Sequence, residues 1–157
     1  GIPRNYFLAG DPYHCQCHAT ARLLAGNLGL ENDDWSLSFQ SRLGPRRWLE
    51  PYTDSTLTEW AREGVKKVDT VCPGFAVDCL ETLEEIALRS SKIFREAGGN
   101  ELRYIPALND NPNHVRALEA LIEPHLSGWL ETSTNDDHDE LNRLAAAERA
   151  RAAGASR

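Results

Sequence analysis

The sequence has no methionine and begins with glycine. A chain of 157 residues without one internal methionine is uncommon, which leaves open that it is a piece of a longer protein. No apolar run approaches the roughly 18 residues of a transmembrane helix, and no apolar signal segment opens the chain. Basic residues are fewer than acidic residues: Lys+Arg 17 and Asp+Glu 24 give a formal charge of −7. This acidic balance argues against nucleic-acid binding and allows at most peripheral membrane contact.

Several common signatures of chemistry are also missing. The sequence contains no Walker loop, no GxGxxG and no GxSxG. These are the usual motifs of nucleotide hydrolysis, dinucleotide binding and serine hydrolysis, so the sequence does not support those functions. Its four cysteines form no CxxC pair, which a structural zinc site usually shows. Without a secretory signal, reduced thiols are the default, and we expect a cytoplasmic protein.

The residues that are present are typical of a globular domain. Hydrophobic residues make up 41% and charged residues 26% of the chain, and its length suffices to bury a core without disulfides. From residue 131 the composition turns polar and acidic, then rich in Ala and Arg. We therefore predict a domain over 1–130 and, over 131–157, a polar linker with a frayed or partner-dependent helix.

Helical and strand patterns alternate along the predicted domain. Residues 1–10 lack periodicity and are predicted to form a loop. Helices are predicted over 11–28, 54–63, 78–97 and 111–130, and strands over 35–39, 66–72 and 102–105. Thr56 and Glu59 have the spacing of a capping box at the start of the second helix. The alternation predicts an α/β fold, with a small parallel sheet flanked by helices on both faces.

Ligands of open parallel sheets bind beyond the carboxyl ends of the strands, where the loops 40–52, 72–77 and 106–111 are expected. The third predicted helix begins there with Asp78, Glu81 and Glu85, whose spacing places all three on one face of an α-helix. Such a row can bind a hard cation or accept protons. The alternative is an ordinary solvated face, which is the commoner outcome of charge rows.

Three further groups of residues have two interpretations each. His14, Cys15 and His18 can bind a soft metal or belong to a partly exposed helix. Cys79 near a helix N-terminus can be a reactive thiol, or it can fill the core. Trp48, which follows Arg46 and Arg47, can stack on a flat ligand with peripheral carboxylates or anchor the loop on the core.

Several runs resemble motifs of one enzyme family. QSRLGPRRWL at 40–49, followed by PYTD at 51–54, resembles the QS(R/K)xGPxxWLxPxTD motif of the ferrochelatase family. CPGFAVDCLETLEE at 72–85 resembles the bacterial segment that holds the family's active-site glutamate. GDPY at 10–13 and LNDNP at 108–112 also fit, so the resemblance extends over about 1–130.

The resemblance implies a fold and an activity. Ferrochelatases consist of two similar Rossmann-like lobes around a cleft and insert ferrous iron into protoporphyrin IX to make haem. This chain resembles the C-terminal lobe. The residues that match functional positions are Glu81 as the catalytic carboxylate, Asp78, Glu81 and Glu85 as the acidic row that handles the metal, and Trp48, Gln40, Ser41 and Arg42 in the porphyrin pocket.

The chain departs from the family pattern in three places. The family's essential histidine lies in a His-Gly-Ile/Leu-Pro motif, and this chain begins at the following glycine, so we expect the fragment alone to lack activity and to need an N-terminal lobe as partner. A histidine of some members stands where Cys79 stands. Some members hold a 2Fe–2S cluster through C-terminal cysteines, but no cysteine follows Cys79, so we expect no such cluster and no cofactor beyond substrate iron.

Two other functions stay open at this point. A sister chelatase would act on another tetrapyrrole or on another metal, such as cobalt or nickel. A stand-alone lobe would bind its ligand without catalysis.

Overall fold

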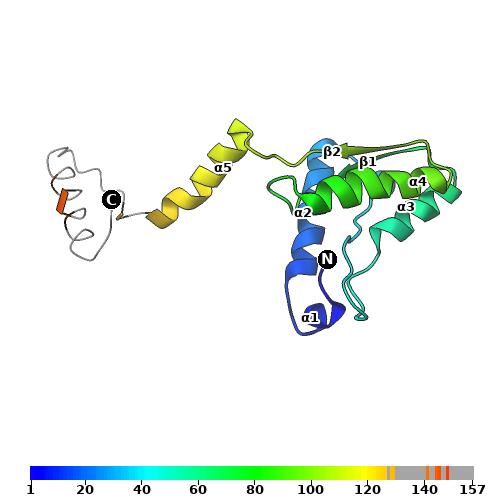
Figure 1. The fold of residues 1–157 in the computed structure, drawn as a ribbon, viewed down its shortest axis with the longest axis horizontal. Coiled ribbons are helices and arrows are strands. Elements are labelled where there is room, and N and C mark those ends of the chain that lie inside the picture. Colours follow the sequence, from blue (N-terminus) through cyan, green and yellow to red (C-terminus); the bar gives the residue numbers. More distant parts are fainter. Residues whose placement is uncertain (127, 130–140, 142–143, 146–147, 149–157) are drawn as a thin grey trace. The chain divides into compact units, whose positions relative to one another are not determined.

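In the computed structural model, the structure describes residues 1–126, 128–129, 141, 144–145 and 148. The chain divides into two compact units, Gly1–Asn111 and Pro112–Arg157. Unit 1 contains the helices α1 (Arg4–Leu8), α2 (Tyr13–Leu28), α3 (Thr53–Arg62) and α4 (Ser91–Glu96) and the strands β1 (Lys67–Val71) and β2 (Glu101–Ile105), which Figure 1 labels. It also contains a short 3-10 helix η1 (Asn32–Asp34) and the π-helix η2 (Glu81–Ser90). Unit 2 contains α5 (Pro112–Ile122) and a 3-10 helix η3 (Glu123–Leu126).

The sheet of unit 1 is small, open and parallel. β1 pairs with β2 in a register that sets Lys67 opposite Glu101 and Val71 opposite Ile105. This pairing requires a crossover, which η2 and α4 supply. The predicted α/β class with a small parallel sheet is thereby confirmed.

The core of unit 1 lies between the sheet and two helices. Leu57 of α3, Phe94 of α4 and Leu102 of β2 belong to one buried cluster, and Phe94 is fully inaccessible to solvent. On the other face of the strands, Arg103 forms a bidentate ion pair with Asp69. The helices pack on the apolar face of the sheet. This packing fixes the carboxyl ends of the strands relative to the start of η2.

The predicted strand over 35–39 is wrong among the described residues. Phe39 makes only an isolated bridge with Tyr52, through hydrogen bonds from the Phe39 N–H to Pro51 and from the Thr53 N–H to Phe39. Alternation of apolar and polar residues indicates which face is buried, but a strand also needs a neighbour to complete a ladder. In the described part of the chain, β1 pairs only with β2.

The N-terminal segment is helical where a loop was predicted. α1 spans only five residues, too few for a periodic apolar pattern to show in the sequence. The next helix, α2, begins as predicted after Asp11, whose carboxylate accepts the Tyr13 N–H at 2.9 Å. It ends at Gly29, which has a left-handed φ of 68°.

The other two predicted helices of unit 1 differ from the structure in detail. α3 begins at Thr53, and the Thr56 hydroxyl donates to the Tyr52 carbonyl, so the predicted capping box with Glu59 does not form. The helix predicted over 78–97 begins instead at Glu81 as the π-helix η2 and continues as α4.

Only part of the predicted C-terminal structure falls within the described residues. α5 begins at Pro112, directly after Asn111, where a helix was predicted. The polar linker predicted from residue 131 lies outside the described residues, apart from 141, 144–145 and 148. No helix among the described residues is long and apolar enough to span a bilayer.

Candidate functional site

The site forms where two segments far apart in the sequence meet. The Gln40 side-chain amide donates to the backbone carbonyl of Glu81 at 3.0 Å, and the Ser41 hydroxyl donates to the Glu85 carboxylate at 2.9 Å. Adjacent residues of the 40–52 loop are thus hydrogen bonded to successive turns of η2. The structure brings together four of the residues predicted for the pocket and for the acidic row.

Gln40 also ties this contact to the end of β1. Its side-chain oxygen accepts a hydrogen bond from the Cys72 thiol at 3.7 Å. Burial first, and then the nearby Asp78 and Cys79, together raise the pKa of Cys72 to about 11. Cys72 is therefore a neutral thiol at physiological pH, which suits hydrogen bonding and not nucleophilic attack.

Glu81 is the first residue of η2 and is exposed to solvent. Hydrogen bonding by the Cys79 side chain, with a smaller contribution from the Glu81 backbone N–H, lowers the pKa of its carboxyl group. At neutral pH the group is a carboxylate that solvent, or a metal ion in solvent, can reach. Cys79 thus acts on the candidate catalytic residue, which neither of its sequence-based interpretations anticipated.

Asp78 has a different environment from the two glutamates. Its carboxylate accepts hydrogen bonds from the Tyr104 hydroxyl at 2.7 Å, the Asn109 amide at 2.8 Å and the Thr82 hydroxyl at 3.0 Å. The Ala107 N–H donates to it as well, at 3.3 Å. These donors, Asn109 first and Tyr104 second, lower the pKa of Asp78 to about 2.

The acidic row does not form on one α-helical face. Asp78 precedes η2, and the helix that carries Glu81 and Glu85 has i to i+5 hydrogen bonding, in place of the assumed 3.6-residue turn. Among the described residues, no three His, Cys, Asp or Glu side chains converge on a possible metal position. The two glutamates supply exposed or half-exposed carboxylates, while Asp78 is held by its donors.

The other predicted pocket residues have partners within the 40–52 loop or just after it. Arg42 forms an ion pair with Asp54, and its guanidinium lies 4.2 Å from the centre of the Tyr52 ring. The Trp48 indole N–H donates to the Leu43 carbonyl at 3.1 Å, which closes the loop on itself. Trp48 therefore anchors the loop, and the residue is half-exposed.

The first residue of the chain lies in the same place. The Gly1 amino group donates to the Gln40 carbonyl at 3.0 Å. Burial lowers the pKa of this amino group, and the nearby Cys17 and Glu85 oppose that shift. The proximity of Gly1 to Glu85 is a feature that spacing could not predict, although the resemblance to the His-Gly-Ile/Leu-Pro motif pointed to this position.

The histidines of α2 belong to an aromatic cluster. The ring centres of His14 and His18 are 4.4 Å apart, and those of His14 and Phe7 are 4.6 Å apart. Burial, followed by His14, lowers the pKa of His18. With Cys15 exposed and no three-ligand group in the described part of the chain, the structure favours packing over the soft-metal interpretation.

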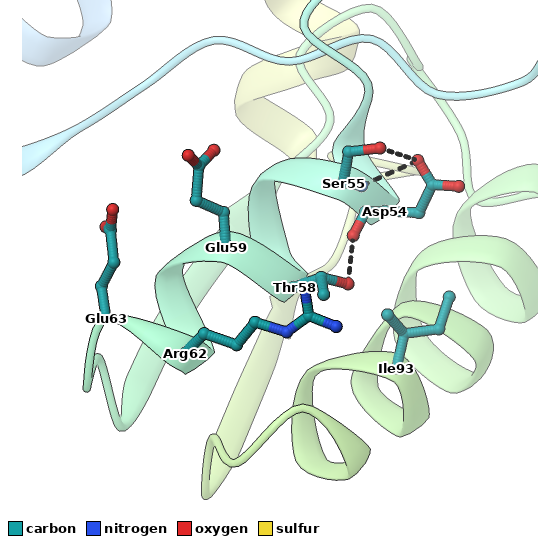
Figure 2. A pocket seen from close by; sticks show the side chains of 7 residues that line it. All are labelled: Asp54, Ser55, Thr58, Glu59, Arg62, Glu63 and Ile93. Atoms are coloured by element: carbon teal, nitrogen blue, oxygen red, sulfur yellow. Dashed lines mark hydrogen bonds between the residues drawn. The ribbon is translucent and has the colours of Figure 1, made fainter.

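An open cavity of about 610 Å³ lies between α3 and α4 (Figure 2). Its lining residues are Asp54, Ser55, Thr58, Glu59, Arg62, Glu63 and Ile93. Figure 2 shows the Ser55 and Thr58 hydroxyls turned to Asp54, with which both form hydrogen bonds. None of the predicted site residues lines this cavity.

Comparison with known proteins identifies similar chains. Residues 1–126 match the family model described as Ferrochelatase. A ferrochelatase from Nitrosococcus oceani is 55% identical over 152 residues, which cover 97% of this chain and 41% of that relative. Ferrochelatases from Thioalkalivibrio sulfidiphilus and a Polaromonas species are 53% and 50% identical, covering 98% and 100% of this chain and 42% of each relative. The chain therefore spans about two fifths of the length of these curated relatives.

Proposed function

The chain belongs to the ferrochelatase family, and from this premise we propose that the complete gene product inserts ferrous iron into protoporphyrin IX to make haem. This chain would supply the C-terminal lobe, with porphyrin, iron and an N-terminal lobe as its partners. The observation that carries the proposal is the contact of the 40–52 loop with η2, through Gln40 to Glu81 and Ser41 to Glu85. It joins the candidate pocket to the candidate metal-handling carboxylates.

The reaction has two chemical requirements that these residues can meet. Two pyrrole protons must leave the macrocycle, and Fe²⁺ must reach its centre. Glu81, an exposed carboxylate with a lowered pKa, can contact the metal or carry protons away. Glu85 would extend the path, while Asp78 would keep the start of η2 in place, because hydrogen-bond donors occupy both its oxygens.

The porphyrin would lie against the 40–52 loop. Trp48 would offer its aromatic ring to the porphyrin. Gln40, Ser41 and Arg42 belong to the same loop and supply polar side chains. A flat aromatic macrocycle stacks favourably on an indole ring. The histidine that the family motif places before Gly1 would then lie close to Glu85, since the Gly1 amino group lies near that carboxylate.

The test is Glu81→Gln in the complete gene product. We expect it to abolish the change in porphyrin absorbance on addition of Fe²⁺, while circular dichroism and the melting temperature stay unchanged. Glu59→Gln on the exposed side of α3 is the matched control and should retain activity. Metal insertion near the wild-type rate by Glu81→Gln would refute the assigned role.

Two other functions would give different results in metal-insertion and porphyrin-binding assays. A sister chelatase would prefer Co²⁺ or Ni²⁺ in competition with Fe²⁺, and the WLxPxTD and DxLET runs favour iron. A non-catalytic lobe would bind porphyrin, measured by fluorescence quenching, without inserting any metal.

Location and cofactors are part of the same proposal. We place the protein in the cytoplasm because all four cysteines are free thiols. The formal charge of −7 supports at most peripheral membrane contact and no nucleic acid as partner. The proposed reaction uses iron as a substrate and needs no 2Fe–2S cluster. Cell fractionation, and iron and sulfide analysis of the purified protein, would test these points.

A further inference from the structure

Asn109 makes an unusual set of hydrogen bonds in the loop after β2. Its backbone N–H donates to the Ala76 carbonyl at 3.0 Å. Its side-chain oxygen accepts the Asp78 N–H at 2.8 Å, and its side-chain amide donates to the Asp78 carboxylate, also at 2.8 Å. The same amide donates to the Ala107 carbonyl at 3.1 Å. Asn109 thereby joins the loop after β2 to the segment between β1 and η2.

Asp78 connects Asn109 to the first turn of η2 through a hydrogen bond with Thr82. The hydroxyl of Thr82, which is fully buried, donates to the Asp78 carboxylate at 3.0 Å and accepts the Cys79 N–H at 3.0 Å. Thr82 directly follows Glu81 in the chain. The orientation of this turn, and with it the origin of the Glu81 side chain, therefore depends on the bonds around Asp78.

We propose that Asn109 is a positioning residue for metal insertion, which holds Glu81 in place through Asp78 and Thr82. The inference rests on the proposed function and deepens it. The hydrogen bonds of Asn109 reach Ala76, Asp78 and Ala107, so it acts on Glu81 through the loop before η2.

Two properties of asparagine fit this position. It donates to a carboxylate and accepts from an N–H at the same time. Its φ of 50° lies in the left-handed region, which asparagine tolerates better than most residues. An aspartate here would lose the donor and set a second negative charge against Asp78.

The test uses a reciprocal exchange in the complete gene product. Asn109→Asp removes the donor, whereas the double variant Asp78→Asn/Asn109→Asp restores one donor and one acceptor between the two side chains. Asn100→Asp, the same change in the exposed loop before β2, is the control. Activity is measured as kcat and KM for porphyrin, and hydrogen exchange is measured for the backbone amides of residues 79–85.

We expect Asn109→Asp to lower kcat about 10- to 100-fold, the usual effect of outer-shell changes, with KM within about twofold. Exchange over residues 79–85 should become faster, and the double variant should recover most of both losses. Asn100→Asp should match the wild type. If Asn109→Asp does not fold, Asn109→Gly replaces it, because glycine keeps the left-handed backbone and removes both side-chain bonds.

Three results would overturn the inference: an unchanged kcat in the folded single variant, a lower kcat without faster exchange, or no recovery in a folded double variant. A wild-type protein that inserts no metal would instead refute the proposed function. In that case the exchange measurements alone would still decide whether Asn109 holds the first turn of η2.

Discussion

Asp78 accepts four hydrogen bonds, and this environment separates it from Glu81 and Glu85, with which the sequence grouped it. All three residues are carboxylates at similar spacing. Their surroundings differ because Tyr104 of β2 and Asn109 of the loop after β2 both donate hydrogen bonds to Asp78. At the residue scale, a carboxylate's role is thus set by the donors around it.

The lowered pKa of Asp78 predicts how stability depends on pH. The carboxyl has a pKa of about 2 in the folded protein and an ordinary value of 3.8 when unfolded, so the folded state favours the charged form. The stabilisation is therefore complete above about pH 4 and is lost as the pH falls from 4 toward 2. Asp78→Asn in the complete gene product should lower the melting temperature most at neutral pH, and the difference from wild type should narrow below about pH 4.

Thermal denaturation followed by circular dichroism between pH 7 and pH 3 measures this difference. Asp33→Asn, in the exposed η1, is the control and should show no such trend. A difference between Asp78→Asn and wild type that stays constant over this range would contradict the assignment of the shift to Asp78.

At the element scale, the π-helix η2 differs most from what the sequence predicted. An apolar pattern with helical spacing predicts a helix but does not distinguish i to i+4 from i to i+5 hydrogen bonding. Asp78 lies before η2, outside the helix that carries Glu81, so the predicted alignment of Asp78 with Glu81 on one helix face fails. Ser90 shows the register, since its hydroxyl donates to the Glu85 carbonyl five residues earlier.

The junction between α4 and β2 depends on a glycine that packs on the core. A Cβ atom added to Gly99 would lie 2.3 Å from a ring carbon of Phe94, which is fully buried. Gly99→Ala should therefore lower the free energy of unfolding by about 1–3 kcal/mol, the usual cost of overpacking. Urea denaturation of the complete gene product would measure the change.

Gly26 provides the matched control for this substitution. It lies inside α2, and a Cβ there would meet no atom within 4 Å. Gly26→Ala should raise stability by about 0.5–1 kcal/mol, because alanine loses less entropy in a helix. Equal effects of the two changes would show that the Phe94 contact does not limit residue 99.

At the scale of the whole molecule, the chain spans about two fifths of the length of its curated relatives. The family resemblance places an essential histidine directly before Gly1, and Gly1 lies beside Gln40 and near Glu85. We therefore expect the 157-residue chain, expressed alone, to show no iron insertion in the porphyrin absorbance assay.

The complete gene product, assayed in parallel, is the positive control for that experiment. Addition of the remaining part of the protein as a separate chain should restore part of the activity if the two parts associate. Iron insertion by the 157-residue chain alone would show that the upstream histidine is dispensable.

Several features followed from the sequence by itself. The α/β class and both strands of the sheet were correctly predicted, because β1 and β2 are short segments that lie between helices and are bounded by turn residues. The family followed from long ordered motifs, such as QSRLGPRRWL. These features depend on residue types and spacing, which a sequence displays directly.

Tertiary structure alone decided the rest. A strand at 35–39 needed a neighbouring ladder that the described residues do not provide. The i to i+5 hydrogen bonding of η2, which buries Thr82, Ile86 and Ser90, was not visible in the spacing of apolar residues. Asn109 and Asp78 meet only because two parallel strands end at the same edge. Contacts between residues 31 apart depend on the path of the intervening chain, so spacing predicted which residues could react but not which would hold them in place.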